Sequence, residues 1–307
     1  MKFRMTAAVL GVAAIAALSS VSARAETVLR FNNFLPRTTF IFSGTLEPWA
    51  KAVEEATDGR VKVEFTASSL GAPQAQFDLV QNGVADLAFS IAGYTPDRIM
   101  LTQVAELPFT GDSSEAISVG LWRVHEEYFA QAEEFKGVKL IGLFTSVPSH
   151  LYTLKGPIDT LADVKGLKLR VAGPVPGAVA EGLGAVPVGA PGVKVVEMLS
   201  AGIIDGTFFS HDGIIDLGLE DDIKYVTTVP NGLFSTVFYI VMNEDAWNEL
   251  SKEDQDAIAS VSGEAFAKTT GAAYDAFAAK ALQMMKDAGV TVTPASDELV
   301  AKIQEIA

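Results

Sequence analysis

The chain has 307 residues, of which 49% are hydrophobic and 20% are charged, so it is too apolar for a disordered protein. Its length suggests about two domains of ordinary size. Acidic residues outnumber basic ones by 38 to 23, and the net charge of −15 argues against a nucleic-acid partner. The absence of cysteine excludes disulfides, thiolate metal sites, a cysteine nucleophile and a lipid anchor on an N-terminal cysteine.

Residues 1–25 have a composition of their own. Lys2 and Arg4 precede an apolar stretch at 7–18, and the sequence ARA at 23–25 closes the segment. The apolar stretch is too short for a bilayer core, which needs about 20 residues. This pattern is typical of a secretion signal that is cleaved after export. We therefore expect a free protein of the periplasm of a Gram-negative bacterium, without a lipid anchor.

The first part of the mature chain alternates expected strands with expected helices. Apolar or alternating segments predict strands at 28–31, 61–65, 84–91 and 138–144. Helical patterns bounded by Gly, Pro and Asp-Gly signals lie at 40–57, 74–81 and 114–135. Strands that are separated by single helices favour parallel β–α–β units and an α/β class.

A second unit of the same class follows. It has expected strands at 167–171 and 203–209 and expected helices at 174–183 and 193–200. The segment 235–242 is strongly β-forming and carries no charge, which predicts a strand that is buried on both faces.

A long helical pattern closes the chain. Ser251, with Asp254 three residues later, predicts the start of a helix. The pattern that follows, 253–288, is long enough to span two domains, and Gly263 and Gly271 are the points at which it is expected to bend. No segment has the composition of a flexible linker, so we expect the domains to share several crossings of the chain.

The motifs of common enzymes and cofactor sites are absent. No phosphate-binding P-loop occurs, the glycines of residues 182–192 lack dinucleotide-binding spacing, and no Gly-x-Ser-x-Gly is present. The three histidines, His125, His150 and His211, lie outside helical or hairpin range of one another. The sequence therefore predicts no metal and no cofactor, and it gives no reason to expect an enzyme.

Several phrases in order along the chain resemble the solute-binding proteins of TRAP transporters, the tripartite ATP-independent periplasmic systems, in the dicarboxylate-binding lineage. Each phrase alone is common, but the ordered set covers nearly the whole mature chain. The phrases are GRVKV at 59–63, LG at 70–71, NGVADL at 82–87, LADVKGLKLR at 161–170, LGAVPV at 183–188, AGIIDG at 201–206 and MN at 242–243, followed by Trp247 and Leu250.

The resemblance implies a fold and a division into domains. Members of this family have two α/β domains, joined by crossing strands and a long helix, which close on a ligand in the cleft between them. Here that implies one domain of residues 26–147 plus about 236–275, and a second of 148–235 plus about 276–307.

The resemblance also implies that Arg170, the last residue of the phrase at 161–170, holds a ligand carboxylate. A guanidinium matches a carboxylate with two parallel hydrogen bonds and keeps its charge. Arg170 would end the expected strand 167–171, where α/β folds place ligands. The alternative is a surface arginine in an ion pair with one of the many acidic residues.

Other positions are assigned to the site with less support. His150 stands where sugar-acid-binding relatives have a second polar contact, with an ordinary histidine at the domain crossing as the alternative. Phe209 stands where many relatives have Asn, so a flat or apolar ligand body is expected there; either Phe209 or its neighbour must be core. His211 follows in the same run, and Phe34 and Tyr94 come after expected strands, at loop positions that face the cleft in such folds.

The function implied by the resemblance is periplasmic capture of a small organic carboxylate, most simply a monocarboxylate, for delivery to TRAP permease subunits in the membrane. We expect the receptor to be a monomer. Two alternatives stay open from the sequence: a ligand-binding subunit that feeds a sensor kinase, and a periplasmic enzyme on the same fold.

Overall fold

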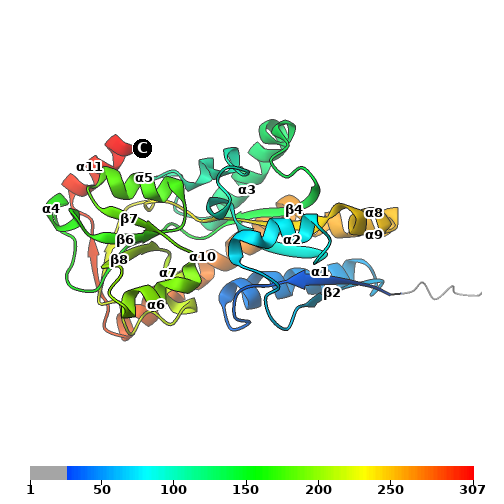
Figure 1. Cartoon of the computed structure of the whole chain (residues 1–307), viewed down its shortest axis with the longest axis horizontal. Helices are drawn as coiled ribbons and strands as arrows, with labels where there is room; N and C mark the ends of the chain where they lie inside the picture. Colours follow the sequence, from blue (N-terminus) through cyan, green and yellow to red (C-terminus); the bar gives the residue numbers. More distant parts are fainter. Residues whose placement is uncertain (1–25) are drawn as a thin grey trace, which may run out of the picture.

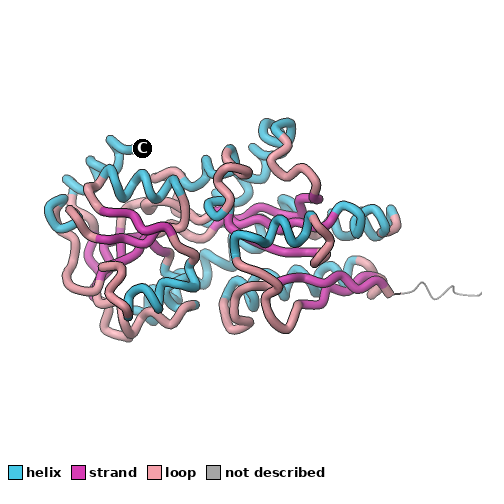
Figure 2. Tube along the Cα trace, in the orientation of Figure 1, coloured by secondary structure: helices cyan, strands magenta, loops and turns pink. Residues whose placement is uncertain are grey.

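The computed structural model describes residues 26–307, which form two β-sheets with helices around each (Figures 1 and 2). The predicted signal at 1–25 lies outside these residues. Among the described residues, no helix is both long and apolar enough to span a membrane. The two sheets lie side by side along the long axis of the molecule.

The first sheet has the strand order β2-β1-β3-β10-β4. Its strands are β1 (Thr27–Asn32), β2 (Val61–Phe65), β3 (Leu87–Ile91), β4 (Val138–Thr145) and β10 (Val237–Asn243). The helices that follow these strands in the chain are α1 (Glu47–Ala56), α2 (Gln76–Gln81), α3 (Ser114–Val124), α8 (Glu244–Glu249) and α9 (Lys252–Ser260). Short π or 3₁₀ turns complete this part at Ile41–Leu46, Pro73–Ala75, Ala92–Tyr94, Leu101–Glu106, His125–Phe129 and Ala130–Ala132.

The second sheet has the order β11-β9-β5-β8-β6-β7. Its strands are β5 (His150–Thr153), β6 (Lys168–Val171), β7 (Val186–Gly189), β8 (Gly206–Phe209), β9 (Tyr225–Thr228) and β11 (Thr291–Pro294). The helices of this part are α4 (Leu161–Val164), α5 (Pro174–Gly182), α6 (Val195–Ser200), α7 (His211–Asp216) and α11 (Asp297–Ile306), with a 3₁₀ turn at Gly192–Lys194.

β1, β2 and β3 pair in parallel, as the alternation of strands and helices predicts, and each sheet also contains one antiparallel strand. β10 runs antiparallel to β3 and β4, and β5 runs antiparallel to β8 and β9. Both strands directly follow a crossing of the chain from one sheet to the other, β4 to β5 and β9 to β10. The chain leaves the first sheet at β4 and returns to it at β10, so these neighbours run in opposite directions, and the same holds for β5 and β9 in the second sheet.

The two crossings are hydrogen-bonded to each other. The backbone N–H of Ser146 donates to the carbonyl of Thr236 at 2.9 Å, and the N–H of Thr236 donates to Oγ of Ser146 at 3.0 Å. Two further backbone bonds join Ser149 to Phe234 and Leu233. The link between the sheets is therefore a short two-stranded ribbon.

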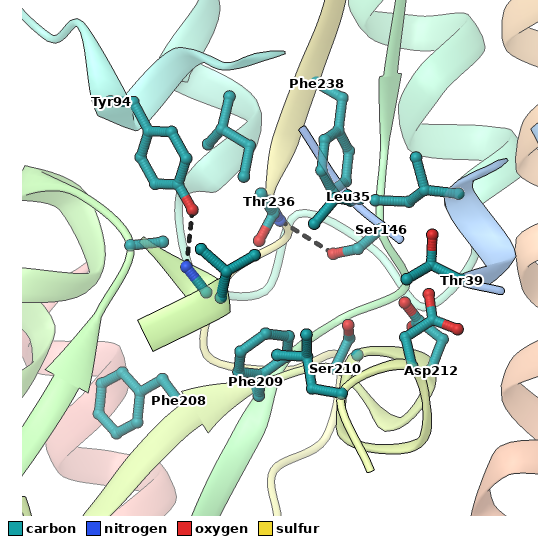
Figure 3. A pocket seen from close by; sticks show the side chains of 18 of the residues that line it. Leu35, Thr39, Tyr94, Ser146, Phe208, Phe209, Ser210, Asp212, Thr236 and Phe238 are labelled. Carbon is teal, nitrogen blue, oxygen red and sulfur yellow. Dashed lines mark hydrogen bonds between the residues drawn. The ribbon is translucent and has the colours of Figure 1, made fainter. Parts of the chain in front are cut away.

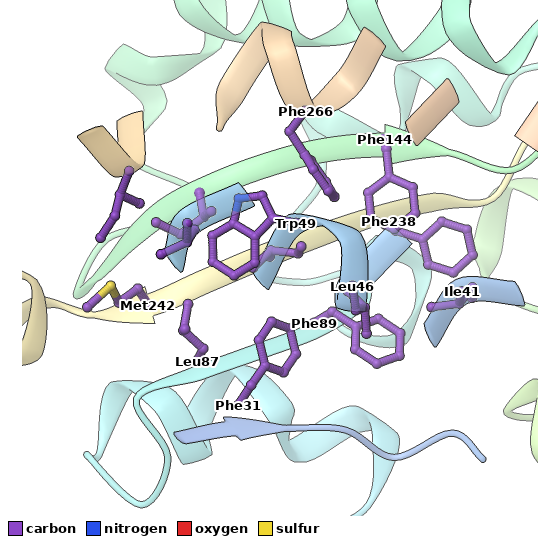
Figure 4. Packing of buried hydrophobic residues seen from close by; sticks show 14 of the residues in the cluster. Phe31, Ile41, Leu46, Trp49, Leu87, Phe89, Phe144, Phe238, Met242 and Phe266 are labelled. Atoms are coloured by element: carbon purple, nitrogen blue, oxygen red, sulfur yellow. The ribbon is translucent and has the colours of Figure 1, made fainter. Parts of the chain in front are cut away.

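β10 is buried on both faces, as its sequence predicts. Val237 to Met242 are all at most 5% exposed. Phe238, Ile240 and Met242 face the cluster drawn in Figure 4, which also contains Trp49 of α1 and Phe266. Val237, Tyr239 and Val241 face the cluster on the other side of the sheet. The expected burial on both faces is confirmed.

The long helical pattern is one short helix followed by one long one. α9 starts after Ser251, whose side chain caps it as predicted, and it ends at Ser260. α10 (Gly263–Asp287) begins at Gly263, which has φ +58°, a value that favours glycine. The second expected bend is wrong: Gly271 lies inside α10, where a Cβ atom would overlap the Glu115 backbone of α3. This glycine allows the two helices to pack closely.

α10 connects the two halves of the molecule, as the resemblance implied. Its first turns place Phe266 and Tyr274 in the core of the first sheet, and its last turns place Met285 in a core of the second. Figure 1 shows the helix running behind both sheets. The two-domain α/β fold with crossing strands and a spanning helix is confirmed, while the exact domain boundaries stay a prediction.

Replacement of a buried acid should make the stability of this fold less sensitive to pH. Glu106 is 2% exposed, its Oε1 accepts a hydrogen bond from the N–H of Val237, and burial raises its pKa to about 8. Between its ordinary pKa of 4.5 and about 8, the folded state holds a proton that the unfolded state has lost, so stability falls as pH rises. Glu106→Gln keeps an acceptor oxygen and cannot ionise.

The free energy of unfolding of Glu106→Gln, relative to wild type, should therefore rise by at least about 1 kcal/mol between pH 5 and pH 8. Urea unfolding at several pH values measures this difference. A Gln variant of the exposed Glu127, which lies outside the core, serves as the control. A difference between Glu106→Gln and wild type that is independent of pH would contradict the assignment.

Candidate functional site

An enclosed pocket lies between the two sheets and is lined from both sides (Figure 3). The cavity has a volume of about 70 Å³, several times the roughly 10–15 Å³ that a single water needs, so it has room for a small molecule. The residues that line it are Phe34, Leu35, Thr39, Ile41, Ile91, Tyr94, Ser146, Thr236 and Phe238 from the first part, and Arg170, Ala172, Gly192, Val193, Phe208, Phe209, Ser210, Asp212, Gly213, Asp216 and Leu217 from the second.

Arg170 supplies the positive charge of this pocket. It lies on β6 and is 2% exposed, and its Nε donates to the carbonyl of Ala190 at 2.8 Å. Among residues 26–307, no Asp or Glu oxygen lies within salt-bridge distance of its guanidinium. Burial lowers the pKa of Arg170 from its usual value, although arginine stays charged in proteins. A buried guanidinium without a carboxylate partner is a strong site for a ligand anion.

Tyr94 reaches the same end of the pocket from the first sheet. Its Oη accepts a hydrogen bond from the N–H of Gly192 at 2.9 Å (Figure 3). A Cβ atom placed on Gly192 would lie 3.7 Å from Nη2 of Arg170, so the tyrosine hydroxyl, this amide and the guanidinium form one polar end. The hydrogen bond also joins elements of the two sheets across the pocket.

Phe209 forms the floor beside Arg170. The guanidinium carbon of Arg170 lies 5.1 Å from the centre of the Phe209 ring, within the range of a cation–π contact. Its neighbour Phe208 is fully buried and belongs to a core of the second sheet. Phe208 therefore belongs mainly to the core, although it also lines part of the pocket, and Phe209 lies against the pocket beside Arg170.

The remaining wall is flat and apolar. Phe34 is stacked on Phe89, with ring centres 4.6 Å apart and planes 13° from parallel. Ile91 and Phe238 add aliphatic and aromatic surface from neighbouring strands β3 and β10. Such a surface favours a planar apolar ligand body.

Two acidic residues that the sequence analysis did not assign lie at the other end, on α7. Asp212 is 3% exposed, burial raises its pKa to about 7, and its Oδ1 has no hydrogen-bond partner among the described residues. Asp216 also has a pKa raised by burial, to about 6, but its Oδ1 accepts a hydrogen bond from the N–H of Phe40 at 2.7 Å. Figure 3 shows Asp212 on the opposite side of the pocket from Tyr94.

The structure does not bring His150 and His211 into this pocket. Their rings lie 4.6 Å apart and line a different cavity, beside Asp275 of α10. Nδ1 of His150 accepts from the N–H of Val229, and Nδ1 of His211 is bonded to the hydroxyl of Tyr152. Burial lowers their pKa values to about 3 and about 4, so both are neutral near pH 7. Their role in ligand binding stays a prediction that this geometry does not support.

No group of three or more His, Asp or Glu side chains within residues 26–307 is arranged to hold a metal ion. The four remaining predicted residues, Phe34, Tyr94, Arg170 and Phe209, all line the one pocket. A buried cation at one end, an apolar middle and buried acids at the other end can hold a small anion whose body is apolar.

Comparison with protein families gives a match to the model of bacterial extracellular solute-binding proteins, family 7, over residues 31–307. The chain belongs to this family. Its members are TRAP solute-binding proteins, so the family resemblance seen in the sequence is confirmed.

Similar proteins of known name cover almost the whole chain. The outer membrane transporter protein TsaT of Comamonas testosteroni is 35% identical over 96% of this chain and 87% of its own length. A TRAP periplasmic solute-binding protein from Bordetella bronchiseptica, solved with bound (R)- and (S)-mandelate, is 34% identical with a TM-score of 0.89, and the match covers 91% of this chain and 89% of that one.

A second solved structure is a marine metagenome TRAP solute-binding protein, specific for aromatic acid ligands and in complex with 3-hydroxybenzoate. It is 33% identical with a TM-score of 0.87, and the match covers 92% of this chain and 89% of that one. This family member, like the first, therefore functions by binding a solute in the fold seen here.

Proposed function

We propose that this chain is a periplasmic receptor that binds a small aromatic monocarboxylate and delivers it to a TRAP permease in the membrane. The observation that carries the proposal is Arg170, which is buried in an apolar pocket with no carboxylate partner among the described residues. A ligand carboxylate would supply the missing anion and accept two hydrogen bonds from the guanidinium fork.

The pocket surface supports an aromatic ligand. Phe34, Phe209 and Phe238 offer flat faces, and the enclosed volume suits a small body rather than a sugar acid with many hydroxyl groups. The two solved relatives bind mandelate and 3-hydroxybenzoate, which are both aromatic monocarboxylates. Phe209 occupies the place where sugar-acid receptors are expected to carry a polar residue.

Location and mechanism form part of the proposal. The expected signal at 1–25 would direct the chain to the periplasm, where it would act as a monomer without a lipid anchor. Ligand that contacts both sheets favours the closed state by its higher affinity for that state. The permease would then recognise the closed form. The receptor would release its ligand unchanged, without metal, cofactor or catalysis.

Calorimetric titration with a panel of acids tests the proposal. We expect benzoate, mandelate and 3-hydroxybenzoate to bind in preference to acetate, succinate and a sugar acid, and benzyl alcohol, which lacks the carboxylate, to bind poorly. Preference for an aliphatic dicarboxylate or a sugar acid would refute the aromatic ligand class. Conversion of a bound acid to a product would favour an enzyme instead.

A further inference from the structure

The acidic end of the pocket contains an unsatisfied acceptor that the binding of a simple carboxylate does not use. Oδ1 of Asp212 has no hydrogen-bond partner among the described residues, although the side chain is 3% exposed and lines the pocket. A buried polar atom without a partner costs roughly 1–3 kcal/mol, so each one needs an explanation. Among the described residues that have such an atom, Asp212 is the one that lines this pocket.

The ring of Phe209 lies close to both Arg170 and Gly213, the residue after Asp212. On one edge, a Cβ atom placed on Gly192 would lie 3.4 Å from Cζ and 3.8 Å from Cε2 of the ring, next to Nη2 of Arg170. On the other edge, a Cβ atom placed on Gly213, the residue after Asp212, would overlap Cε1 and Cδ1. Arg170 lies over the face of this ring, at the end of the pocket where Tyr94 is bonded to Gly192. Asp212 lies on the opposite side of the pocket from Tyr94 (Figure 3).

Asp216, the second acidic residue of α7, already has a hydrogen-bond partner. Its Oδ1 accepts a hydrogen bond from the N–H of Phe40, which belongs to the first part of the chain. This bond joins the two sides of the pocket whatever ligand is present. Among the described residues, Asp212 makes no bond to the first part of the chain. Its carboxylate is hydrogen-bonded to Ser210, and its Oδ1 has no partner within residues 26–307.

We propose that Asp212 selects ligands that carry a hydroxyl group on the side of the aromatic body away from the carboxylate. The hydroxyl donates to Oδ1 of Asp212 while the carboxylate binds Arg170, so the ligand is a hydroxylated aromatic monocarboxylate. A ligand with a second carboxylate in place of the hydroxyl should bind poorly. That carboxylate would be repelled by Asp212 and Asp216, and it has no hydrogen to donate to Oδ1. This inference rests on the proposed function and names its substrate class more closely.

Raised pKa values at this end agree with a water-poor environment. Burial raises the pKa of Asp212 to about 7, and the neighbouring charge of Asp216 raises it further. A hydrogen bond from a ligand hydroxyl would favour the ionised carboxylate and remove the cost of its unsatisfied oxygen.

The test compares benzoate, the 3- and 4-hydroxybenzoates and benzene-1,3-dicarboxylate by calorimetry on the full mature chain. In wild type, at least one hydroxybenzoate should bind about 10- to 100-fold more tightly than benzoate, as for a hydrogen bond to a charged group, and the dicarboxylate should bind worst. In Asp212→Ala, the ratio of the affinity for the hydroxybenzoate to the affinity for benzoate should fall to about one. Asp212→Asn keeps an acceptor oxygen but no charge, so it should retain part of the ratio and admit the dicarboxylate.

Asp216→Asn is the matched control on the same helix. It weakens the bond to Phe40, so it should lower the affinity for all of these ligands by a common factor and leave the ratio as in wild type. Binding of benzoate without any gain from a hydroxyl group, or a gain that survives in Asp212→Ala, would overturn this inference alone. Failure of every aromatic acid to bind wild type would overturn the proposed function and the inference with it.

Discussion

Arg170→Ala is expected to lower the affinity for an aromatic carboxylate by about 2–5 kcal/mol, the usual cost of truncating one partner of a buried charge pair. The guanidinium is 2% exposed, and no carboxylate among residues 26–307 lies within salt-bridge distance to take its place. The ligand carboxylate would lose both its counter-charge and its two donors, while its apolar body would keep its contacts. Calorimetric titration with benzoate and 3-hydroxybenzoate measures the loss.

Two further variants separate charge from geometry. Arg170→Lys keeps a positive charge but not the planar fork, so it should recover part of the affinity. Arg123→Ala removes an exposed arginine that pairs with Glu264 far from the pocket, and it should bind as wild type does. Unchanged affinity in Arg170→Ala would remove this residue from the site and leave the proposed ligand class without its main support.

Gly173→Ala is expected to lower the affinity for every ligand about 10- to 100-fold, because it prevents the close approach of the two halves. Overpacking of a tight contact costs about 1–3 kcal/mol. Gly173 caps α5 and meets Gly93, which follows β3 in the other sheet. A Cβ atom on Gly173 would lie 2.8 Å from Cα of Gly93, and backbone atoms cannot move aside as a flexible side chain can. The backbone at Gly173 is extended, so alanine brings no strain of its own.

Gly177→Ala is the matched control, one turn further along α5. A Cβ atom there meets only a side-chain methyl of Val171 at 3.9 Å, so affinity should not change and helix stability should rise slightly. Melting curves of the two unliganded variants check that Gly173→Ala is folded. Wild-type affinity in Gly173→Ala would show that close approach of Gly93 and Gly173 is not required for binding.

Much of this architecture was predictable because the local signals agree with the packing. The uncharged segment 235–242 predicted a doubly buried strand, and Ser251 predicted a helix start, since each follows from short-range physics. The short strands β5, β7, β9 and β11 were not predicted. Each has only four residues, too few for a clear period, and each depends on pairing with distant segments.

Site residues could be predicted from the sequence only where they belong to a recognisable motif or follow an expected strand. Arg170 ends a recognisable phrase, and Tyr94 and Phe34 follow expected strands, so these residues could be assigned before the fold was known. Asp212 and Asp216 were missed because their neighbours in sequence carry no motif and α7 was not expected. The signal that could have found them is their position just beyond the end of β8, where α/β sheets place ligands.

His150 shows how little a position on a strand says about the direction of a side chain. It pairs with Phe209 in the register of β5 and β8, so its backbone lies close to a residue that lines the pocket. Its ring nevertheless faces the other cavity and accepts a hydrogen bond from the N–H of Val229. Directly opposed residues of an antiparallel pair share one face of the sheet, so the register alone would have placed His150 beside Phe209. The direction of its ring, away from the pocket, could not be read from the sequence.

A crystal structure of the mature chain with bound 3-hydroxybenzoate tests the central claim most directly. The account predicts the carboxylate within hydrogen-bond distance of both terminal nitrogens of Arg170, the ring among Phe34, Phe209 and Phe238, and the hydroxyl directed to Asp212. A carboxylate bound instead near His150 and His211, or an occupied pocket in which Arg170 contacts no ligand atom, would contradict it.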